Sequence, residues 1–286
     1  MPTARDLQRQ INTVKNQSRV FSALQTVSSV KFRKAEARVK RARPYADNVE
    51  QMMRDVASSA SGDLPLLVGR EVNRVAICTL TADRGLAGGF NAQVLRRTVS
   101  LRNEKDQNAL QVASGRKAVA FFRFRRVELA EVFTGFTDNP TYDKAREIGS
   151  TLTSLFEDEE ADEVYLVYNR FESALNQTPV VKRLLPVAEE GDEEQDDGAS
   201  YMEYVPDAET VLKRLVPRYV ETMVWQALLE GAAGEHGARM TAMKNASDNA
   251  NDLVRDLTLQ MNKARQAQIT QEILEIVSGA EALSAG

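Results

Sequence analysis

The chain has 286 residues, of which 43% are apolar and 27% are charged, and its formal net charge is −4. These values are ordinary for a soluble globular protein of one or two domains, and the overall charge does not favour nucleic-acid binding. A single cysteine, Cys78, and a single histidine, His236, exclude a disulfide framework within the chain and argue against a structural zinc site. The apolar runs, such as Val75–Leu80, are too short to predict a membrane span.

The first predicted element is a long helix over residues 3–57. Apolar residues recur along it at the spacing of a narrow helical stripe, which includes Leu7, Ile11, Val14, Phe21, Leu24 and Val27. A helix of this length extends roughly 80 Å at ~1.5 Å per residue, so it needs a long packing partner. We expect Pro44 to bend it, because a proline ring clashes with the preceding turn. The segment is basic: residues 1–44 contain eleven Lys or Arg and two acids.

The middle segment, 70–205, predicts a small α/β domain. Its patterns indicate strands over 74–82, 109–115, 127–136, 164–171 and 178–187, and helices over 90–106, 116–124 and 142–160. Alternation of strand and helix predicts a layered, Rossmann-like domain with a largely parallel sheet. The acidic stretch EEGDEEQDDG, 189–198, has seven acids in its first nine residues and reads as a solvated surface loop.

The last predicted element is a second long helix over 208–283, again with helical apolar spacing. Gly231, Gly234 and Gly237 predict a softened or kinked point, because each glycine costs up to about 1 kcal/mol relative to alanine. Two long terminal helices with narrow stripes can pair as an antiparallel coiled coil, with the α/β domain as the connection between them. The predicted segments are therefore 1–60, 70–205 and 208–286. We expect Met240 and Met243 to pack within the coiled coil, and His236 to be exposed among the glycines.

The glycine-rich stretch TADRGLAGGFNAQV, 81–94, lies between a predicted strand and a predicted helix, where a phosphate-binding loop is often found. Its glycines do not fit the GxxxxGK[ST] spacing of a P-loop or the GxGxxG dinucleotide pattern. A structural turn is therefore favoured, with Asp83 and Arg84 as a local ion pair or a partner contact. A nucleotide-binding enzyme that uses this loop is the alternative function, and a nucleic-acid-binding coiled coil with a basic first helix is a third.

Three stretches resemble the gamma subunit of F-type ATP synthases, and the resemblance runs along the whole chain in order. TADRGLAGGFN is similar to the family's SDRGL(C/A)GGxN signature. ARMTAMKNASDNANDLVRDLTLQMNKARQAQITQEILEIVSGAEAL, 238–283, resembles the C-terminal signature at nearly every position. RDLQRQINTVKNQSRVFSALQTVSSVKFRKAE, 5–36, is similar to the N-terminal helix. The stretch ALQTVSSV, 23–30, departs from the family's usual Lys- and Met-rich pattern, which puts functional carry-over there in doubt.

The resemblance implies a rotor with a coiled-coil shaft inside a ring of three alpha and three beta subunits. It implies that the α/β domain stands against the epsilon subunit and the membrane c-ring, and that the chain couples proton-driven rotation to ATP synthesis or hydrolysis on beta. It also implies no catalytic residue, no cofactor, no metal and no nucleic acid. The start of the sequence has neither an apolar signal-peptide core nor a transit-like extension. We therefore expect a bacterial peripheral subunit on the cytoplasmic face of the plasma membrane.

The resemblance also implies candidate contact residues for the alpha/beta ring. In the C-terminal segment they are Arg239, Arg265, Gln266, Thr270 and Glu272, and in the basic first helix they are Lys15, Arg19, Lys31 and Arg33. The plainer alternative is that these are ordinary polar positions on a coiled coil. In the α/β domain the candidate loop residues are Asp83, Arg84, Gly85, Gly88 and Gly89.

Overall fold

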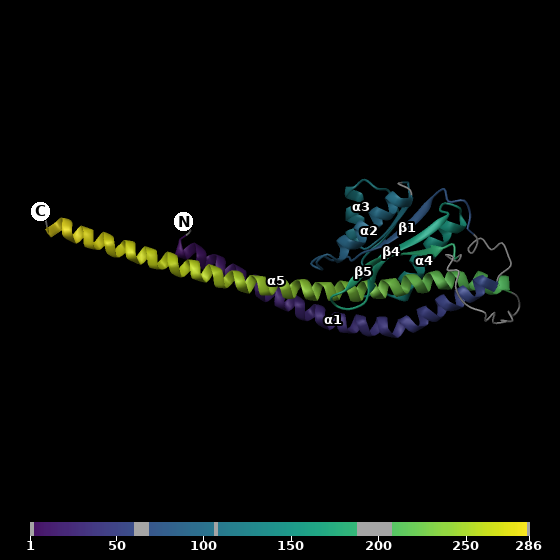
Figure 1. Ribbon diagram of the computed structural model, residues 1–286, viewed down its shortest axis with the longest axis horizontal. Helices are drawn as coiled ribbons and strands as arrows, with labels where there is room; N and C mark the ends of the chain where they lie inside the picture. Colours follow the sequence, from purple (N-terminus) through teal and green to yellow (C-terminus); the bar gives the residue numbers. More distant parts are fainter. Residues whose placement is uncertain (1–2, 60–68, 106–107, 188–207, 285–286) are drawn as a thin grey trace. The chain divides into compact units, whose positions relative to one another are not determined.

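The structure is a computed structural model that describes residues 3–59, 69–105, 108–187 and 208–284. In chain order (Figure 1) its elements are α1 (Ala4–Ser59), β1 (Val75–Leu80), α2 (Phe90–Lys105), β2 (Leu110–Ser114), α3 (Arg116–Phe124), β3 (Leu129–Phe133), α4 (Tyr142–Glu157), β4 (Glu163–Phe171), β5 (Gln177–Leu185) and α5 (Ala208–Ser284). The acidic stretch 189–198 lies outside the described residues. Within the described ranges, no helix combines the length and hydropathy needed to cross a membrane.

The chain forms two compact units, and both terminal helices contribute to each of them. The terminal unit contains Met1–Val27 and Met240–Gly286, and the sheet unit contains Ser28–Arg239. The C-terminal half of α1 and the first part of α5 therefore belong with the sheet. The three segments predicted along the sequence remain a description of chain order rather than of packing.

The sheet unit is built on a five-stranded sheet in the order β3-β2-β1-β4-β5. The first four of these strands are parallel to their neighbours, and β5 runs antiparallel to β4. All six residues of β1 are buried, as expected for a parallel strand that is covered on both faces. This arrangement confirms the predicted α/β class with a largely parallel sheet.

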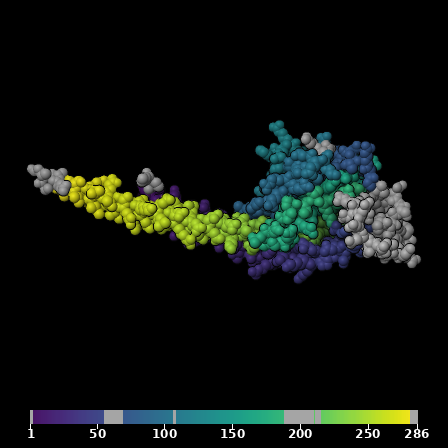
Figure 2. Space-filling view, viewed as in Figure 1, coloured from purple at the N-terminus to yellow at the C-terminus, as the bar shows by residue number. Residues whose placement is uncertain are grey.

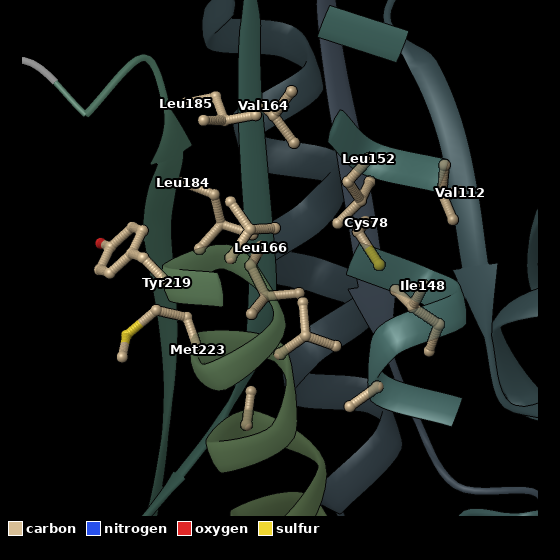
Figure 3. Close-up of a cluster of buried hydrophobic side chains, with 14 of the residues drawn as sticks. Cys78, Val112, Ile148, Leu152, Val164, Leu166, Leu184, Leu185, Tyr219 and Met223 are labelled. Atoms are coloured by element: carbon tan, nitrogen blue, oxygen red, sulfur yellow. The ribbon is translucent and has the colours of Figure 1, made fainter. Parts of the chain in front are cut away.

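Helices cover both faces of the sheet. One face packs against α2, through Val94 and Leu101, and against α3, through Phe122. The opposite face packs against α4 and against the early turns of α5 (Figures 1 and 3), where Ile148 and Met223 belong to one buried cluster. Because α5 contributes to this core, part of the second long helix is an integral layer of the α/β unit.

The terminal unit consists of the two helix ends packed together. Leu7 and Ile11 of α1 are buried with Leu257 of α5. Further along α1, the Ser18 hydroxyl donates to Asn251 Oδ1 at 2.9 Å and lies 3.2 Å from the Ser247 hydroxyl. Residue numbers rise along α1 as they fall along α5, so this pair of helix ends is antiparallel, as predicted.

Both long helices are continuous through the positions at which a bend or a softened point is expected. Helix α1 continues through Pro44, and α5 continues through all three glycines of its middle region. Two of the three glycines, Gly234 and Gly237, have a packing role, whereas a Cβ at Gly231 would meet nothing within 4 Å. A Cβ at Gly234 would lie 2.9 Å from the Phe90 ring, and a Cβ at Gly237 would lie 3.1 Å from the Ala174 Cα atom. The small residues thus allow α5 to approach α2 and the β4–β5 turn closely, which glycine propensity alone does not reveal.

Gly115 lies between β2 and α3, and replacing it with alanine tests how tightly the edge of the sheet is packed. Its φ is +92°, and a Cβ there would lie 2.1 Å from the Thr81 carbonyl oxygen, whereas Gly135 has φ +89° and would meet nothing within 4 Å. Both Gly→Ala changes impose backbone strain, but only Gly115→Ala also forces a backbone clash. We expect urea unfolding to show a loss of about 1 kcal/mol for Gly135→Ala and of at least about 3 kcal/mol for Gly115→Ala. Equal losses would contradict the packing described.

Candidate functional site

The glycine-rich turn crosses the edge of the sheet where the parallel strands end. Asp83 lies in it, directly after β1, and its Oδ1 accepts a hydrogen bond from the Arg116 backbone N–H at 3.0 Å. Its Oδ2 accepts from the backbone N–H of Gly135 at 2.9 Å and of Thr137 at 3.1 Å. Asp83 therefore ties the ends of β1, β2 and β3 together.

This geometry places a carboxylate of the protein itself where an α/β domain could hold a phosphate. Arg116 is the first residue of α3, and helix N-termini at such an edge attract anions. The Arg116 N–H is used by Asp83, and the Ala118 N–H donates to the Thr81 hydroxyl at 2.8 Å. Within the glycine-rich turn itself, the Ala82 N–H donates to Asn91 Oδ1 and the Asp83 N–H donates to the Thr137 hydroxyl, each at 2.8 Å. Two N–H groups that a nucleotide-binding loop could offer are therefore already used.

Burial tends to raise the pKa of Asp83, but the N–H donors of Gly135, Thr137 and Arg116 outweigh burial, so the pKa lies below its ordinary value. The carboxylate is therefore ionised at neutral pH and remains fixed by its donors. No ion pair of Asp83 with Arg84 occurs among the described residues, and the Arg84 side chain is exposed. In place of the expected ion pair, Asp83 is held by the backbone N–H groups of Arg116, Gly135 and Thr137.

The remaining residues of the turn give it a projecting tip. Leu86 has φ 61° and is 61% exposed, and Gly88 has φ 54°. Gly88 and Gly89 are exposed, and Gly85 is half-buried. On the inner side, the Ala82 N–H donates to Asn91 Oδ1 at 2.8 Å, which fixes the turn to the start of α2. The tip presents Arg84 and Leu86 to solvent on a rigid base.

Arg239 fastens this turn to α5. Its Nε and Nη2 donate to the Gly85 carbonyl oxygen at 3.2 Å and 3.1 Å, and Nη2 also donates to Glu235 Oε1 at 2.5 Å. Arg239 is 8% exposed and Glu235 is 1% exposed. Burial raises the pKa of Glu235, while Arg239 opposes that rise. The guanidinium is thus engaged inside the sheet unit, and we leave Arg239 out of the partner surface proposed below.

The expectation that His236 is exposed was wrong. His236 is 2% exposed, and its Nε2 lies 3.2 Å from the Asp138 carbonyl oxygen and 3.5 Å from Asp138 Oδ1. The small residues around it allow α5 to pack closely, so the ring is covered rather than solvated. Burial lowers the pKa of His236, more than the nearby Asp138 raises it. Lys31 of α1 forms an ion pair with Asp138, so this loop connects both long helices within the sheet unit.

The other predicted contact residues lie on open helix surfaces. In the terminal unit, Lys15 and Arg19 of α1 and Arg265, Gln266, Thr270 and Glu272 of α5 are all exposed. Arg33, in the sheet unit, is exposed as well. The last turns of α5 form an uncovered segment, residues 265–280, in yellow in Figure 2.

Apolar side chains are unusually open on this segment. Ile273 is 55% exposed, Leu274 is 60% exposed and Ile276 is 72% exposed. Contiguous exposed apolar surface of this kind marks an interaction site. The sequence had indicated the segment by its helical pattern, and the structure shows that nothing described in the chain covers it.

Some anchoring residues were not found from the sequence. Glu230 of α5 accepts hydrogen bonds from the Phe171 N–H at 3.0 Å and from Arg43 Nη2 at 3.1 Å. Glu235, Thr137 and Asp138 were missed in the same way. The one available signal was the four-residue spacing of Glu235 and Arg239 on a helix. Among the described residues, no cluster of His, Cys, Asp or Glu forms a candidate metal site.

The Asp83 network predicts a pH-dependent stability. Because its pKa is lower in the folded chain, the stabilisation is complete above about pH 4 and is lost as the pH falls through the folded pKa. We expect Asp83→Asn to cost about 1–2 kcal/mol at pH 7, given its partial exposure, and the difference from the unchanged chain to shrink below about pH 4. Urea unfolding at both pH values measures this, with the exposed Asp248→Asn as control. A difference that is the same at both pH values would contradict the network.

The Arg239 contact predicts a strong coupling with Glu235. Arg239→Met leaves a buried carboxyl without its cation, and we expect a loss of about 3 kcal/mol in the free energy of unfolding. Adding Glu235→Gln should restore at least about half of that loss, because the amide tolerates burial without a counter-charge. A double-mutant cycle by urea unfolding measures the coupling. Simple addition of the two single effects would show that the pair does not act as one unit.

Comparisons with known proteins agree with this geometry. The family model described as ATP synthase matches residues 3–283. An ATP synthase gamma chain from Rubrobacter xylanophilus is 67% identical over 290 aligned positions, covering 100% of both chains. One from an Anaeromyxobacter species is 44% identical, covering 99% of this chain and 100% of that protein.

Solved structures show the same fold at low sequence identity. A chain of the Euglena gracilis mitochondrial ATP synthase rotor matches with a TM-score of 0.69 and 18% identity, covering 93% of this chain and 98% of that chain. A chain of the Tetrahymena thermophila central stalk and c-ring assembly matches with a TM-score of 0.61 and 20% identity, covering 80% of this chain and 99% of that chain. On the strength of the family model and the full-length curated relatives, this chain belongs to the ATP synthase gamma chain family.

Proposed function

We propose that this central-stalk subunit couples proton-driven rotation of a membrane c-ring to ATP synthesis or hydrolysis in the beta subunits of an alpha/beta ring. The observation that carries the proposal is the exposed apolar end of α5, which is one continuous helix with the buried layer of the sheet unit. A rotor needs both features: an end that contacts its surroundings without deep polar anchors, and a folded unit that other subunits can bind.

The physical task of such a subunit is to bias several equivalent sites unequally. A ligand or partner shifts a conformational equilibrium only through a difference in interaction free energy between the states. One asymmetric chain inside a ring of three alpha and three beta subunits supplies that difference, because each beta subunit meets another face of it. The chain itself then performs no bond chemistry and binds no cofactor, and catalysis belongs to the beta subunits.

The contact residues on the helices form the finer part of the proposal. We assign Arg265, Gln266, Thr270 and Glu272 to contacts with the ring, because they are exposed on the same segment as the open apolar residues. On α1, Lys15 and Arg19 of the terminal unit and Arg33 of the sheet unit are exposed bases that suit acidic partner loops, whereas Lys31 is paired with Asp138 and is left out of the proposal. Exposed charge pairs are individually weak, so these contacts act as a group.

In this proposal the sheet unit is the part of the subunit that binds the other subunits of the rotor. Its partners are the epsilon subunit and the c-ring, and the exposed tip of the glycine-rich turn, Arg84 and Leu86, is a further contact. The subunit then works as a peripheral protein at the cytoplasmic face of a bacterial plasma membrane and meets the membrane indirectly. The nucleotide-enzyme alternative is not favoured, because the glycine spacing fits neither phosphate-binding pattern and the N–H groups of Ala82 and Asp83 in the turn are already used by Asn91 and Thr137.

The contact proposal predicts a sharp difference between neighbouring positions of α5. In complexes assembled with alpha and beta subunits, the triple change Arg265→Ala, Gln266→Ala and Thr270→Ala should reduce ATP hydrolysis at least about tenfold, since hydrogen bonds to charged groups contribute about 1.5–3 kcal/mol each. The matched control is Gln271→Ala, Glu275→Ala and Ser278→Ala, which are exposed on the same segment.

The control complexes should keep more than half of the activity, and the isolated chain should hydrolyse no ATP. Equal losses of ATP hydrolysis in the two triple variants would contradict the assignment of these residues as contacts. Failure of the unchanged chain to assemble with alpha and beta subunits would contradict the rotor proposal itself.

A further inference from the structure

The single histidine of the chain, His236, has a polar partner at each of its two ring nitrogens. Its Nε2 lies 3.2 Å from the carbonyl oxygen of Asp138, in the loop that follows β3, and its Nδ1 lies 3.5 Å from Nη1 of Arg239 on α5. All three residues belong to the sheet unit, and the imidazole is buried. The protonation state of such a ring is set by what each partner can donate or accept.

The two partners of His236 select the neutral imidazole. The Asp138 carbonyl oxygen only accepts hydrogen bonds, so we assign the ring hydrogen to Nε2. A guanidinium group only donates, so the Nδ1 atom that faces Arg239 is the acceptor and carries no hydrogen. Burial favours the same state, because it lowers the pKa of His236 more than the nearby Asp138 raises it. A second proton, on Nδ1, would be directed at a cation that has no acceptor for it.

Charged groups from every element around the histidine act on this cluster. They come from α1, the glycine-rich turn, the loop after β3, and α5, and are Lys31, Asp83, Arg84, Asp138, Glu235 and Arg239. Lys31 pairs with Asp138, and Arg239 pairs with Glu235. The pKa of Asp83 lies below its ordinary value, so its carboxylate stays ionised at neutral and mildly acidic pH. Burial raises the pKa of Glu235, so an experiment has to distinguish its titration from that of His236.

Arg239 connects the histidine to the glycine-rich turn. Its Nε and Nη2 donate to the Gly85 carbonyl oxygen at 3.2 Å and 3.1 Å. Because Gly85 and Arg239 belong to different elements, a shift of the guanidinium away from the imidazole breaks both of these hydrogen bonds. Ala87 is buried in a cluster that packs against Ala238 of α5, so the inner side of the turn has a separate attachment to the helix. The stretch around Gly85 is the part that depends on Arg239.

We propose that His236 is a pH-sensitive switch: the neutral ring accepts from Arg239 and keeps it on the Gly85 carbonyl, and protonation of Nδ1 displaces Arg239 and releases the tip of the turn from α5. Since the pKa of His236 in the folded chain lies below its ordinary value of 6.5, the contact is complete above pH 6.5 and is lost as the pH falls through the folded pKa. The tip is then fixed at neutral pH and mobile in acid. The proposal does not depend on the rotor function.

Because the chain has one histidine, NMR tests the switch directly. We would follow the His236 ring and the Leu86 amide of the isotope-labelled full chain from about pH 8 down to acid unfolding. The Leu86 N–H and the Gly85 carbonyl belong to the same peptide group, so loss of the hydrogen bonds from Arg239 changes the Leu86 amide shift. We expect the ring hydrogen on Nε2 at about pH 8, a His236 midpoint below pH 6.5, and a change of the Leu86 shift with the same midpoint.

Two variants assign the switch. His236→Gln keeps one donor and one acceptor but takes up no proton, so the Leu86 transition should disappear. Arg239→Met removes the cation that opposes protonation, and the pKa of His236 should rise by at least about 0.5 unit, because coupling between two sites is reciprocal. The matched control is Arg255→Met, which removes an exposed arginine of α5 that pairs with Asp252. It should leave both midpoints unchanged.

An imidazole that stays neutral until the chain unfolds would overturn the proposal, and so would a Leu86 amide that does not respond when His236 is protonated. A Leu86 transition that persists in His236→Gln would assign the release to Glu235 and would also overturn it. Circular dichroism verifies that the chain is folded across the titration. Because the titration of the unchanged chain needs no substitution, the test stays decisive even if Arg239→Met does not fold.

Discussion

The structure depends on the close approach of α5 to the edge of the sheet. From Val216 to Arg239 most side chains of this helix are buried, and two of its glycines allow the Phe90 ring and the Ala174 backbone to approach the helix closely. Arg239 and Glu235 then place a charged pair in the space between helix and turn. The packing and this ion pair depend on each other, because a buried ion pair is tolerated only where close packing holds both charged groups against their partners.

The same approach explains how the subunit can transmit torque. A force applied to the sheet reaches α5 through a packed apolar face and through two contacts that have defined partners, namely Gly85 with Arg239 and Asp138 with His236. The helix then continues without a break into its exposed terminal segment. Packed interiors transmit strain because they have few voids to absorb it. Side chains that face solvent in the terminal segment are free to meet different neighbours at different angles.

Much of the fold could be predicted from the sequence. The continuous apolar run of β1, the alternation of strands with helices, and the narrow stripes of the long helices are local patterns, and local patterns are what periodicity detects. The antiparallel direction of β5 could not be obtained in this way, because direction depends on a connection rather than on composition.

The site was harder to predict for the same reason. The donors to Asp83 are about 30 to 55 positions further along the chain, and no spacing rule connects them. His236 was expected to be exposed because glycines usually mark open turns, whereas here they mark the closest packing in the helix. Sequence spacing argued against a phosphate loop, and in the structure the N–H groups of Ala82 and Asp83 in this turn are used by Asn91 and Thr137. Conversely, the exposure of the last turns of α5 agrees with their sequence, since open apolar residues at helical spacing require a partner.

Hydrogen exchange of the full chain, resolved by segment, tests the central claim most directly. The account predicts that amides of 219–239 exchange only through global unfolding, because that stretch of α5 is part of the core, while amides of 265–280 exchange faster by orders of magnitude. Exchange of 219–239 as fast as that of 265–280 would contradict it, because α5 would then not be a fixed layer of the sheet unit.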